Sequence, residues 1–403
     1  MRPTVTEPCA AWWRPSAGRS PAAGVEAVTV EAEGSGSHRA WLALAVVAEA
    51  GEDRLLRCAS CGYAAIAEWA IFRKPPGPEG IPRPIEPMAT PGQRTIEDLA
   101  GFLGVPPSAT LKAVFYDVEG ETVFVVIRGD LARSERKLAR LLGARRLRLT
   151  PDAAVRGAGL VLGSTSPVGL RGIRVVGDDS IVGGVNFVAG ANQPDIHLRK
   201  VNVPRDFAVV REGDIALARG EACIHCGGPL VADQAIVLGE VETVATSAAE
   251  ARRARFLNRE GSLQPLWLAT YGLDVSRLLA AVLERHHDER GIVWSPEGAL
   301  FAVYLVALGE DRPEVAAAAK AAYAALWNAG LETLYDEREE TAGVKFMDAD
   351  VLGLPLRLTV SRRSVASGGV ELKERATGAL RMRPLAEVVA GVQAAPGTVA
   401  RVR

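Results

Sequence analysis

No apolar run in this sequence approaches the roughly 18 residues that a membrane-spanning helix needs. The apolar stretch Trp41 to Ala48 is too short for that purpose. The N-terminus also lacks a basic region followed by a clean apolar core, which argues against a signal peptide. We therefore expect a cytoplasmic protein that does not bind membranes.

A strong net charge is absent too. The formal net charge is −1, so no global positive field attracts the chain to nucleic acid, and we expect no binding to DNA. Contacts with RNA would depend on local basic surface, for which Arg133 to Arg148 and Arg252 to Arg255 are the candidates. Solvated helix faces are the alternative interpretation of both stretches.

Cysteines are few, and most of them are paired in sequence. Of five cysteines, four form two CxxC pairs, Cys58 with Cys61 and Cys223 with Cys226, and a glycine follows each pair. This pattern is typical of zinc knuckles, in which two thiolates lie on a tight turn. Because an inserted domain leaves and re-enters its host at neighbouring points, the two pairs are expected to share one structural zinc ion. Two unrelated knuckles or a redox pair are the alternatives, and Cys9 is interpreted as incidental.

The length of 403 residues allows about two to four domains. Residues 1–24 are expected to be disordered, strands are expected at 25–30 and 41–48, and the Pro- and Gly-rich stretch 74–91 is expected to be a linker. An α+β domain follows, with a helix capped by Thr95, strands at 111–117 and 122–128, and a helix capped by Ser134. An amphipathic helix is expected at 276–287. Beyond Pro296, strands and helices alternate, which indicates an α/β domain with a mixed sheet.

The middle domain contains a group of residues that suggests a binding site. The run Gly163 to Leu170 is a loop stiffened by glycine and by Pro167, and it is followed by His197. Lys112 begins the first strand of the expected hairpin among apolar residues. Taken singly, His197 is more often a surface histidine and Lys112 a charge at a strand edge, so the combination is what points to function.

The sequence resembles a known family at this point. The segments TIEDLA, TLKAVFY, VIRGDL, SPVGL, GANQPDIH and VNVPRDF resemble the editing insertion of bacterial prolyl-tRNA synthetases. The run Tyr271 to Ala281, with His286 to Glu289, is similar to motif 3 of that class II synthetase. From Phe301 onward the chain is similar to the family's anticodon-binding domain, through Asp336 to Arg338, Gly343 to Phe346, Asp348 to Asp350 and Val370 to Lys373. Met1 to Gly24 match nothing in the family.

The resemblance implies a multidomain α/β and α+β fold. Residues 25–73 and 208–296 would form a remnant of the antiparallel class II core, 74–207 the inserted editing domain, and 297–403 the anticodon-binding domain. In the editing domain, Lys112 would pair with the phosphate of the terminal nucleotide and Gly163 to Pro167 would shape the amino-acid pocket. Asp178 and His197 would line the same site. The resemblance also assigns Arg277 to ATP, and it assigns Lys345, Glu371 and Lys373 to tRNA binding.

Several departures from the family fall on one activity, proline activation. Motifs 1 and 2 are not found, and Arg39-Ala40 replaces a usual Glu-Phe pair. Gly239 to Glu242 replaces a Gly-His-Ile-Phe element, and Asp274 stands where a small glycine is usual. We therefore expect the site for ATP and magnesium to be degenerate.

These features predict an enzyme that hydrolyses mischarged Ala-tRNA(Pro) and does not charge tRNA itself. One alternative is a non-catalytic protein that only binds tRNA. The other is a working ATP-dependent proline–tRNA ligase, if this sequence is truncated or if a second subunit completes it. A full synthetase, or self-association, would supply that second subunit.

Overall fold

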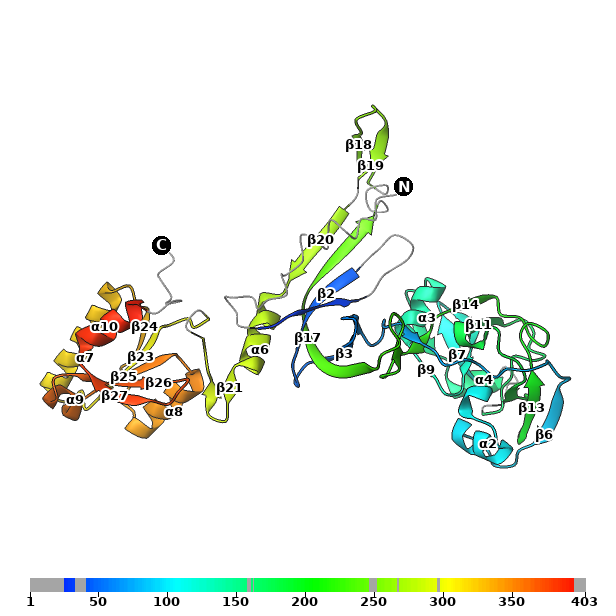
Figure 1. Cartoon of the computed structure of the whole chain (residues 1–403), viewed down its shortest axis with the longest axis horizontal. Coiled ribbons are helices and arrows are strands. Elements are labelled where there is room, and N and C mark those ends of the chain that lie inside the picture. Colours follow the sequence, from blue (N-terminus) through cyan, green and yellow to red (C-terminus); the bar gives the residue numbers. More distant parts are fainter. Residues whose placement is uncertain are drawn as a thin grey trace.

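The computed structural model describes residues 25–32, 41–157, 161, 163–245, 252–266, 268–295 and 298–394. The expected disorder of residues 1–24, the turn at 34–38, and the residues Cys9, Arg39 and Ala40 lie outside these ranges. Figure 1 shows an elongated arrangement in which a central sheet lies between an inserted domain and a C-terminal domain. In the described part of the chain, no helix is long and apolar enough to cross a membrane.

The central sheet is almost entirely antiparallel, as expected for the class II core. Its strand order is β2-β1-β4-β3-β17-β20, and β17 also pairs with β2. The long strand β17 pairs first with β3 and then with β2 and β20, and helix α6 packs beside it. The elements are β1 (Val28–Glu31), β2 (Trp41–Val47), β3 (Asp53–Cys58), β4 (Ala64–Ile66), β17 (Leu230–Ala245), β20 (Leu268–Leu273) and α6 (Val275–Arg285). A separate hairpin is formed by β18 (Arg255–Leu257) and β19 (Leu263–Pro265).

The inserted domain leaves and returns through paired strands. The outgoing strand β5 (Phe72–Arg73) pairs antiparallel with the returning strand β16 (Ala222–Cys223). Between them lie a five-stranded sheet of order β10-β7-β8-β11-β14 and a three-stranded sheet of order β12-β13-β6. These strands are β6 (Glu86–Ala89), β7 (Leu111–Val118), β8 (Glu121–Arg128), β10 (Leu147–Leu149), β11 (Arg174–Asp178), β12 (Phe187–Gly190), β13 (Ile196–Val201) and β14 (Arg211–Gly213).

Two expected boundaries of the insertion need correction. The stretch 74–91 is not only a linker, because it contains strand β6, which pairs with β13. The insertion also extends past residue 207, because β14 belongs to its larger sheet, and β15 (Ala216–Leu217) pairs with β9 (Ala132–Arg133) of the same domain. The helices agree with expectation: α2 (Ile96–Leu103) is capped by Thr95 and α3 (Glu135–Leu142) by Ser134. A third helix, α4, spans Asp152–Gly157.

The apolar run of β8 explains why the two sheets of the insertion pack together. Val123, Val125 and Ile127 face one core, which includes Leu138 of α3. Phe124 and Val126 face a second core, which is shared with β12 and β13. A strand that is buried on both faces reads as a continuous apolar run in sequence. Burial of each such side chain contributes about 1.5–3 kcal/mol, so this packing fixes β12 and β13 against the larger sheet.

The C-terminal domain has the expected α/β fold with a mixed sheet. The strand order is β24-β23-β25-β26-β27; the first three strands are parallel, and the pairings β25–β26 and β26–β27 are antiparallel. Helices α7 and α10 pack against one core and α8 against another. The elements are β23 (Val303–Leu308), α7 (Pro313–Asn328), β24 (Thr333–Asp336), α8 (Ala342–Leu352), β25 (Leu356–Ser361), α9 (Arg362–Ala366), β26 (Val370–Glu374), β27 (Leu380–Arg383) and α10 (Leu385–Ala394).

Candidate functional site

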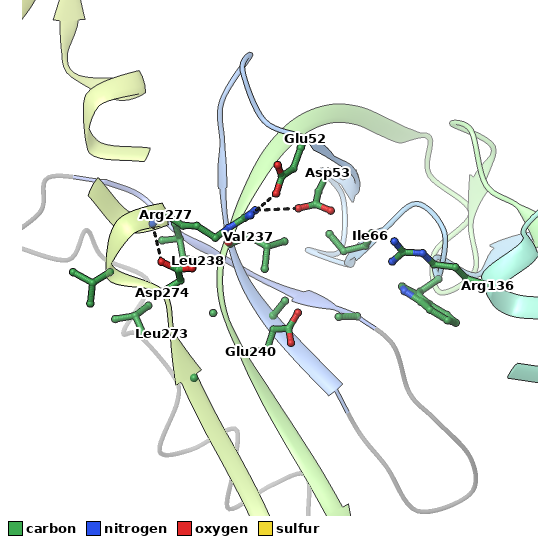
Figure 2. Close-up of a pocket in the computed structure, with 16 residues that line it drawn as sticks. Glu52, Asp53, Ile66, Arg136, Val237, Leu238, Glu240, Leu273, Asp274 and Arg277 are labelled. Atoms are coloured by element: carbon green, nitrogen blue, oxygen red, sulfur yellow. Dashed lines mark hydrogen bonds and ion pairs between the residues drawn. The ribbon is translucent and has the colours of Figure 1, made fainter. Parts of the chain in front are cut away.

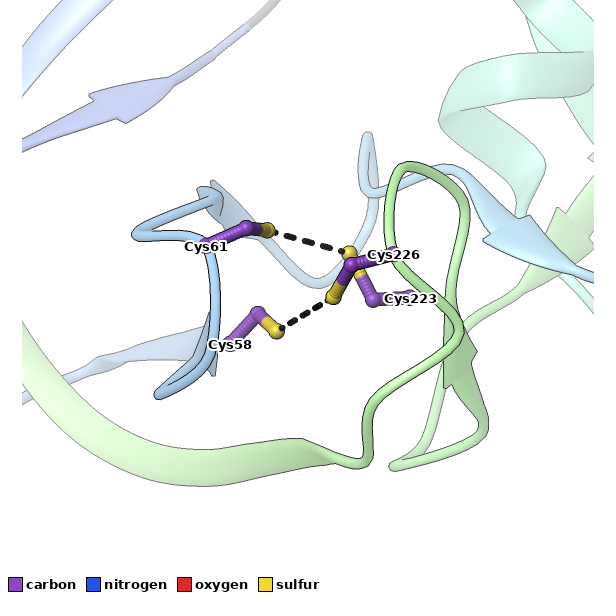
Figure 3. A group of neighbouring side chains, drawn as sticks. All are labelled: Cys58, Cys61, Cys223 and Cys226. Atoms are coloured by element: carbon purple, nitrogen blue, oxygen red, sulfur yellow. Dashed lines mark hydrogen bonds between the residues drawn. The ribbon is translucent and has the colours of Figure 1, made fainter.

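The four cysteines of the two CxxC pairs come together where the insertion joins the central sheet (Figure 3). All four sulfur atoms lie within 4.8 Å of one another. The Sγ atoms of Cys58 and Cys226 are 3.4 Å apart, and those of Cys61 and Cys223 are 3.6 Å apart. Cys58 and Cys223 are buried, whereas Cys61 and Cys226 are exposed. The expected proximity of the two pairs is therefore confirmed.

Each pair has the backbone of a metal knuckle. The amide of Gly62 donates to the carbonyl of Cys58 at 3.0 Å, and the amide of Gly227 donates to the carbonyl of Cys223 at 2.9 Å. Both glycines have positive φ, 77° and 75°, a conformation that other residues rarely adopt. The backbone amide of Cys61 lowers the pKa of the Cys58 thiol to about 6, which favours the thiolate there. At Cys61 the Tyr63 amide, which lowers the pKa, is outweighed by burial and the neighbouring sulfurs, which raise the pKa to about 12. Four thiolates at this spacing fit a closed tetrahedral zinc site with no open position.

The glycine- and proline-containing loop of the insertion is held by one side chain. The Oδ1 atom of Asn192 accepts from the amide of Ser166 at 2.8 Å, and its Nδ2 donates to the carbonyl of Val168 at 3.1 Å. The amide of Asn192 also donates to the carbonyl of Ser164 at 2.8 Å. Gly163 opens the loop with φ 84°. The loop from Gly163 to Pro167 is therefore fixed rather than free.

Gly190 lets this loop approach strand β12. A Cβ atom at Gly190 would lie 2.2 Å from the carbonyl oxygen of Ser164 and 2.5 Å from that of Thr165. No other residue type fits there without displacing backbone. Gly190 is also the direct cross-strand partner of His197 on β13. The strand pairing thus brings His197 to the Gly163–Pro167 loop, as the resemblance implied.

His197 is buried and bound through one ring nitrogen. Its Nδ1 atom lies 2.6 Å from the Oγ1 atom of Thr90, which is itself fully buried. Desolvation lowers the pKa of His197. The imidazole is therefore neutral at pH 7. Thr90 follows strand β6 directly, inside the stretch expected to be a linker, so sequence reasoning missed it.

Lys112 is a half-buried cation without a partner. No hydrogen bond or ion pair engages its ammonium in the part of the chain that the structure describes. Burial is the largest influence on its pKa, and it lowers that pKa. Thr110 bridges to Val188 of β12, and both Lys112 and Gly190 lie two residues beyond that bridge on adjacent, parallel segments. The backbone of Lys112 is therefore level with that of Gly190. Its side chain alternates with those of Leu111 and Ala113, which face the core shared with β12 and β13, so it lies on the other face of β7.

Asp178 has a different place from the one expected. Its side chain is fully buried and forms an ion pair with Lys74 at 3.0 Å. The amides of Ser180 and Ile215 each donate to it at 2.9 Å. Lys74 also pairs with Asp214 at 2.7 Å, and it lies among three carboxylates that are close to one another, those of Asp178, Asp179 and Asp214. Asp178 therefore ties β11 to the two ends of the insertion's chain, near Lys74 and Ile215, which corrects the expectation that it lines the substrate site.

The central sheet carries a second site, a cleft of about 740 Å³ (Figure 2). Arg277 lies in it, and its guanidinium pairs with Glu52 and with Asp53, the latter at 3.5 Å. Its Nε also donates to the carbonyl of Val237. Asp274 caps helix α6 by accepting from the amide of Arg277 at 3.0 Å. The arginine assigned to ATP is thus already bound by carboxylates.

The charges that line this cleft favour a cation over a nucleotide. Four carboxylates, those of Glu52, Asp53, Glu240 and Asp274, face two guanidinium groups, those of Arg136 and Arg277. The difference is two negative charges. A triphosphate entering such a cleft meets net repulsion.

The C-terminal domain corrects one of the three expected tRNA contacts. Lys345 is buried, and its ammonium donates to the carbonyls of Ala307 at 3.2 Å and Asp336 at 3.1 Å. It stabilises the sheet and is not available to a phosphate. Lys373 is partly exposed and pairs with Asp350 at 2.7 Å.

Beside Lys373, the sheet presents polar groups that sequence reasoning missed. The guanidinium of Arg357 lies 3.9 Å from the ring centroid of Phe346 and 4.0 Å from Glu371. The Nε of Arg357 and the Oγ1 of Thr359 are buried without hydrogen-bond partners. Arg357 is opposite Lys373, and Thr359 is opposite Glu371. The only signal in the sequence was the alternation of polar residues along β25.

Comparison with known proteins identifies two regions of the chain. Residues 90–207 match the aminoacyl-tRNA editing domain family, and residues 302–395 match the anticodon binding domain family. The chain is 45% identical over 372 residues to a proline–tRNA ligase of Dehalococcoides mccartyi (strain CBDB1), covering 91% of this chain and 65% of the relative. It is 43% identical over 351 residues to a proline–tRNA ligase of Salinispora tropica, covering 84% of this chain and 59% of that relative.

The chain thus spans just under two thirds of the length of these relatives. Among solved structures, Giardia lamblia prolyl-tRNA synthetase in complex with prolyl-adenylate aligns with a TM-score of 0.35 and 22% identity. That alignment covers 38% of this chain and 33% of the other.

Proposed function

Because this chain belongs to the prolyl-tRNA synthetase family, we propose that it hydrolyses alanine mischarged to tRNA(Pro) in its inserted domain. The observation that carries the proposal is Lys112, a half-buried ammonium with no partner among the described residues, in the domain that also contains the fixed loop and a neutral histidine. Such a cation is suited to bind a phosphate that is brought to it. The reaction adds water to the ester carbonyl carbon and breaks the bond to the ribose oxygen, which takes a proton from the water.

The need for this reaction follows from a limit of binding. A pocket built for proline rejects a smaller amino acid by only a few kcal/mol, so a second site must remove the error. The loop Gly163 to Pro167, clamped by Asn192, has a fixed shape. We infer that it admits alanine and crowds the larger proline ring. The four-cysteine site would hold a structural zinc ion, and no step of the hydrolysis uses it.

The C-terminal domain is proposed to bind the anticodon loop of tRNA(Pro). Lys373 would contact phosphate, and Glu371 would contact a base edge. Arg357 and Thr359 add buried donors without partners next to them, and Phe346 adds an aromatic face. Binding should weaken as salt increases. Affinity that is unchanged by substitutions in the anticodon would contradict this assignment.

A direct test uses the purified full chain with Ala-tRNA(Pro) and Pro-tRNA(Pro) as separate substrates. The alanyl ester should be hydrolysed much faster than the prolyl ester. Alanyl-ester hydrolysis no faster than without protein, with the insertion folded, would overturn the proposal. The chain would then be a non-catalytic tRNA-binding protein.

One observation favours a second function, ATP-dependent proline–tRNA ligation: the cleft that holds Arg277. The carboxylates bound to Arg277 argue against it. We therefore propose that this chain alone aminoacylates tRNA poorly or not at all. Proline-dependent pyrophosphate exchange well above a blank without protein would refute this.

A further inference from the structure

The contact between Thr90 and His197 determines where the histidine carries its proton. The Thr90 hydroxyl is fully buried, and His197 Nδ1 is its only hydrogen-bond partner within the described residues. The backbone around Thr90 is also fixed, because its amide donates to the carbonyl of Asp195 at 2.8 Å. The hydroxyl therefore cannot turn toward water.

Two arrangements of protons are consistent with the distance of 2.6 Å. If the ring donates from Nδ1, the hydroxyl proton of Thr90 is left buried without an acceptor, which costs about 1–3 kcal/mol. If the hydroxyl donates to Nδ1, the hydroxyl proton and Nδ1 satisfy each other, and Nε2 is the one polar group of the pair without a partner among the described residues. The second arrangement places the single proton of the neutral ring on Nε2.

The environment of the ring supports a neutral histidine. The shift of its pKa is downward, and burial is its only cause, so no carboxylate stabilises a second proton. The other ring nitrogen, Nε2, has no hydrogen-bond partner in the residues that the structure covers. His197 thus has one committed nitrogen and one that remains available.

We propose that Thr90 is a positioning residue that fixes His197 as the Nε2–H tautomer, so that His197 donates a hydrogen bond to the substrate's ester carbonyl. This deepens, and rests on, the proposed hydrolysis of Ala-tRNA(Pro). When water adds to that carbonyl, its oxygen becomes negative, and a donor already in place stabilises the charge. A neutral imidazole is suited to this task. Fixed in this tautomer, His197 does not act as the base that activates water.

The tautomer is measured directly by NMR on the ¹⁵N-labelled wild-type protein. Correlations between ring protons and nitrogens distinguish a protonated from a bare nitrogen, and His197→Gln identifies the signal among the five histidines. We expect a proton on Nε2 and a bare Nδ1 at pH 7. A proton on Nδ1, or a doubly protonated ring, would overturn the proposal. This arm needs no activity, so it decides the proposal even if hydrolysis is not observed.

The role is tested by two variants. Thr90→Val keeps the shape and removes the donor, so kcat for Ala-tRNA(Pro) should fall about five- to tenfold with little change in KM, because the bond matters most in the transition state. Thr90→Ser keeps the donor and should restore most of the rate. Thr333→Val is the control, since Thr333 is also buried and, among the described residues, its hydroxyl bonds only to the carbonyl of Leu331, in the C-terminal domain.

The kinetic outcomes distinguish the proposed role of Thr90 from the proposed hydrolysis of Ala-tRNA(Pro). If the wild-type chain hydrolyses Ala-tRNA(Pro) and Thr90→Val does so equally well, the role of Thr90 is refuted while the proposed function stands. Equal losses in Thr90→Ser and Thr90→Val would also refute it. If Thr90→Val does not fold, the serine variant and the wild-type NMR spectrum still decide.

Discussion

Lys112 in the insertion and Arg277 in the central cleft are both expected, by family resemblance, to bind phosphate, yet their surroundings are opposite. Lys112 is half-buried and has no partner among the described residues. Arg277 is bound by two carboxylates and a backbone carbonyl. A cation that is already neutralised must lose its partners before it can bind a ligand. A cation that a family resemblance assigns to phosphate can therefore bind phosphate only if neighbouring carboxylates do not already occupy it.

The largest expected effect concerns the cysteine site, which joins the two regions. Cys223→Ser should abolish stoichiometric zinc binding and lower the melting temperature markedly, because a structural metal contributes directly to folding. Metal analysis and thermal unfolding provide the measurement. Wild-type protein purified without about one zinc per chain would show that the four thiols serve another purpose. Brief chelation should leave deacylation intact until the site unfolds.

Next in size is the effect of removing the free cation. Lys112→Ala should slow hydrolysis of Ala-tRNA(Pro) by about ten- to a hundredfold, because a charge-assisted, partly desolvated contact is worth about 1.5–3 kcal/mol. The matched control is Lys320→Ala. Lys320 is exposed on α7, and it too has no partner among the described residues. Equal rates for the two variants would remove the basis for placing substrate at Lys112.

A smaller change should follow from the close approach of Gly190 to the loop. Gly190→Ala places a Cβ atom 2.2 Å from the Ser164 carbonyl, so the loop must move. We expect about 1–3 kcal/mol of lost stability and a weaker preference for alanine over proline, measured by unfolding and by the ratio of the two deacylation rates. Gly101→Ala is the control, because nothing lies within 4 Å of a Cβ atom there. An unchanged ratio for Gly190→Ala would separate the loop from specificity.

Much of the fold was predictable because local signals and packing agree. Three local signals predicted the structure formed at their own positions: the apolar run of strand β8, the helix caps Thr95 and Ser134, and the two CxxC pairs. Strand β6 was missed because Pro87 reads as a linker residue. Proline is tolerated there because β6 lies at the edge of its sheet and pairs only with β13.

The site was less predictable, since a sequence shows a charge but not its partner. Asp178 is neutralised by Lys74, which lies 104 residues away in the chain. Lys345 lies on a helix of ordinary composition, and only the packing of α8 on the sheet shows that its ammonium is buried. The role of Thr90 could not be predicted from the sequence, because only the pairing of β6 with β13 places Thr90 beside His197.

The smallest expected effect follows from removing a carboxylate partner of Arg277. Glu52→Gln removes one of its two carboxylate partners and should strengthen ATP binding to the cleft, because the guanidinium becomes freer and the excess negative charge falls. Arg277 is 33% exposed and Glu52 is 68% exposed, so solvent screens the pair and the gain should not exceed about 1 kcal/mol, or roughly fivefold in affinity. Equilibrium binding of ATP at low salt measures this gain in affinity.

Glu49→Gln is the control, because Glu49 is exposed nearby and forms no ion pair within the described residues. Deacylation should be unchanged in both variants, since the cleft is separate from the insertion's site. If Glu52→Gln binds ATP no better than Glu49→Gln, the ion pair is not what keeps nucleotide out of this cleft.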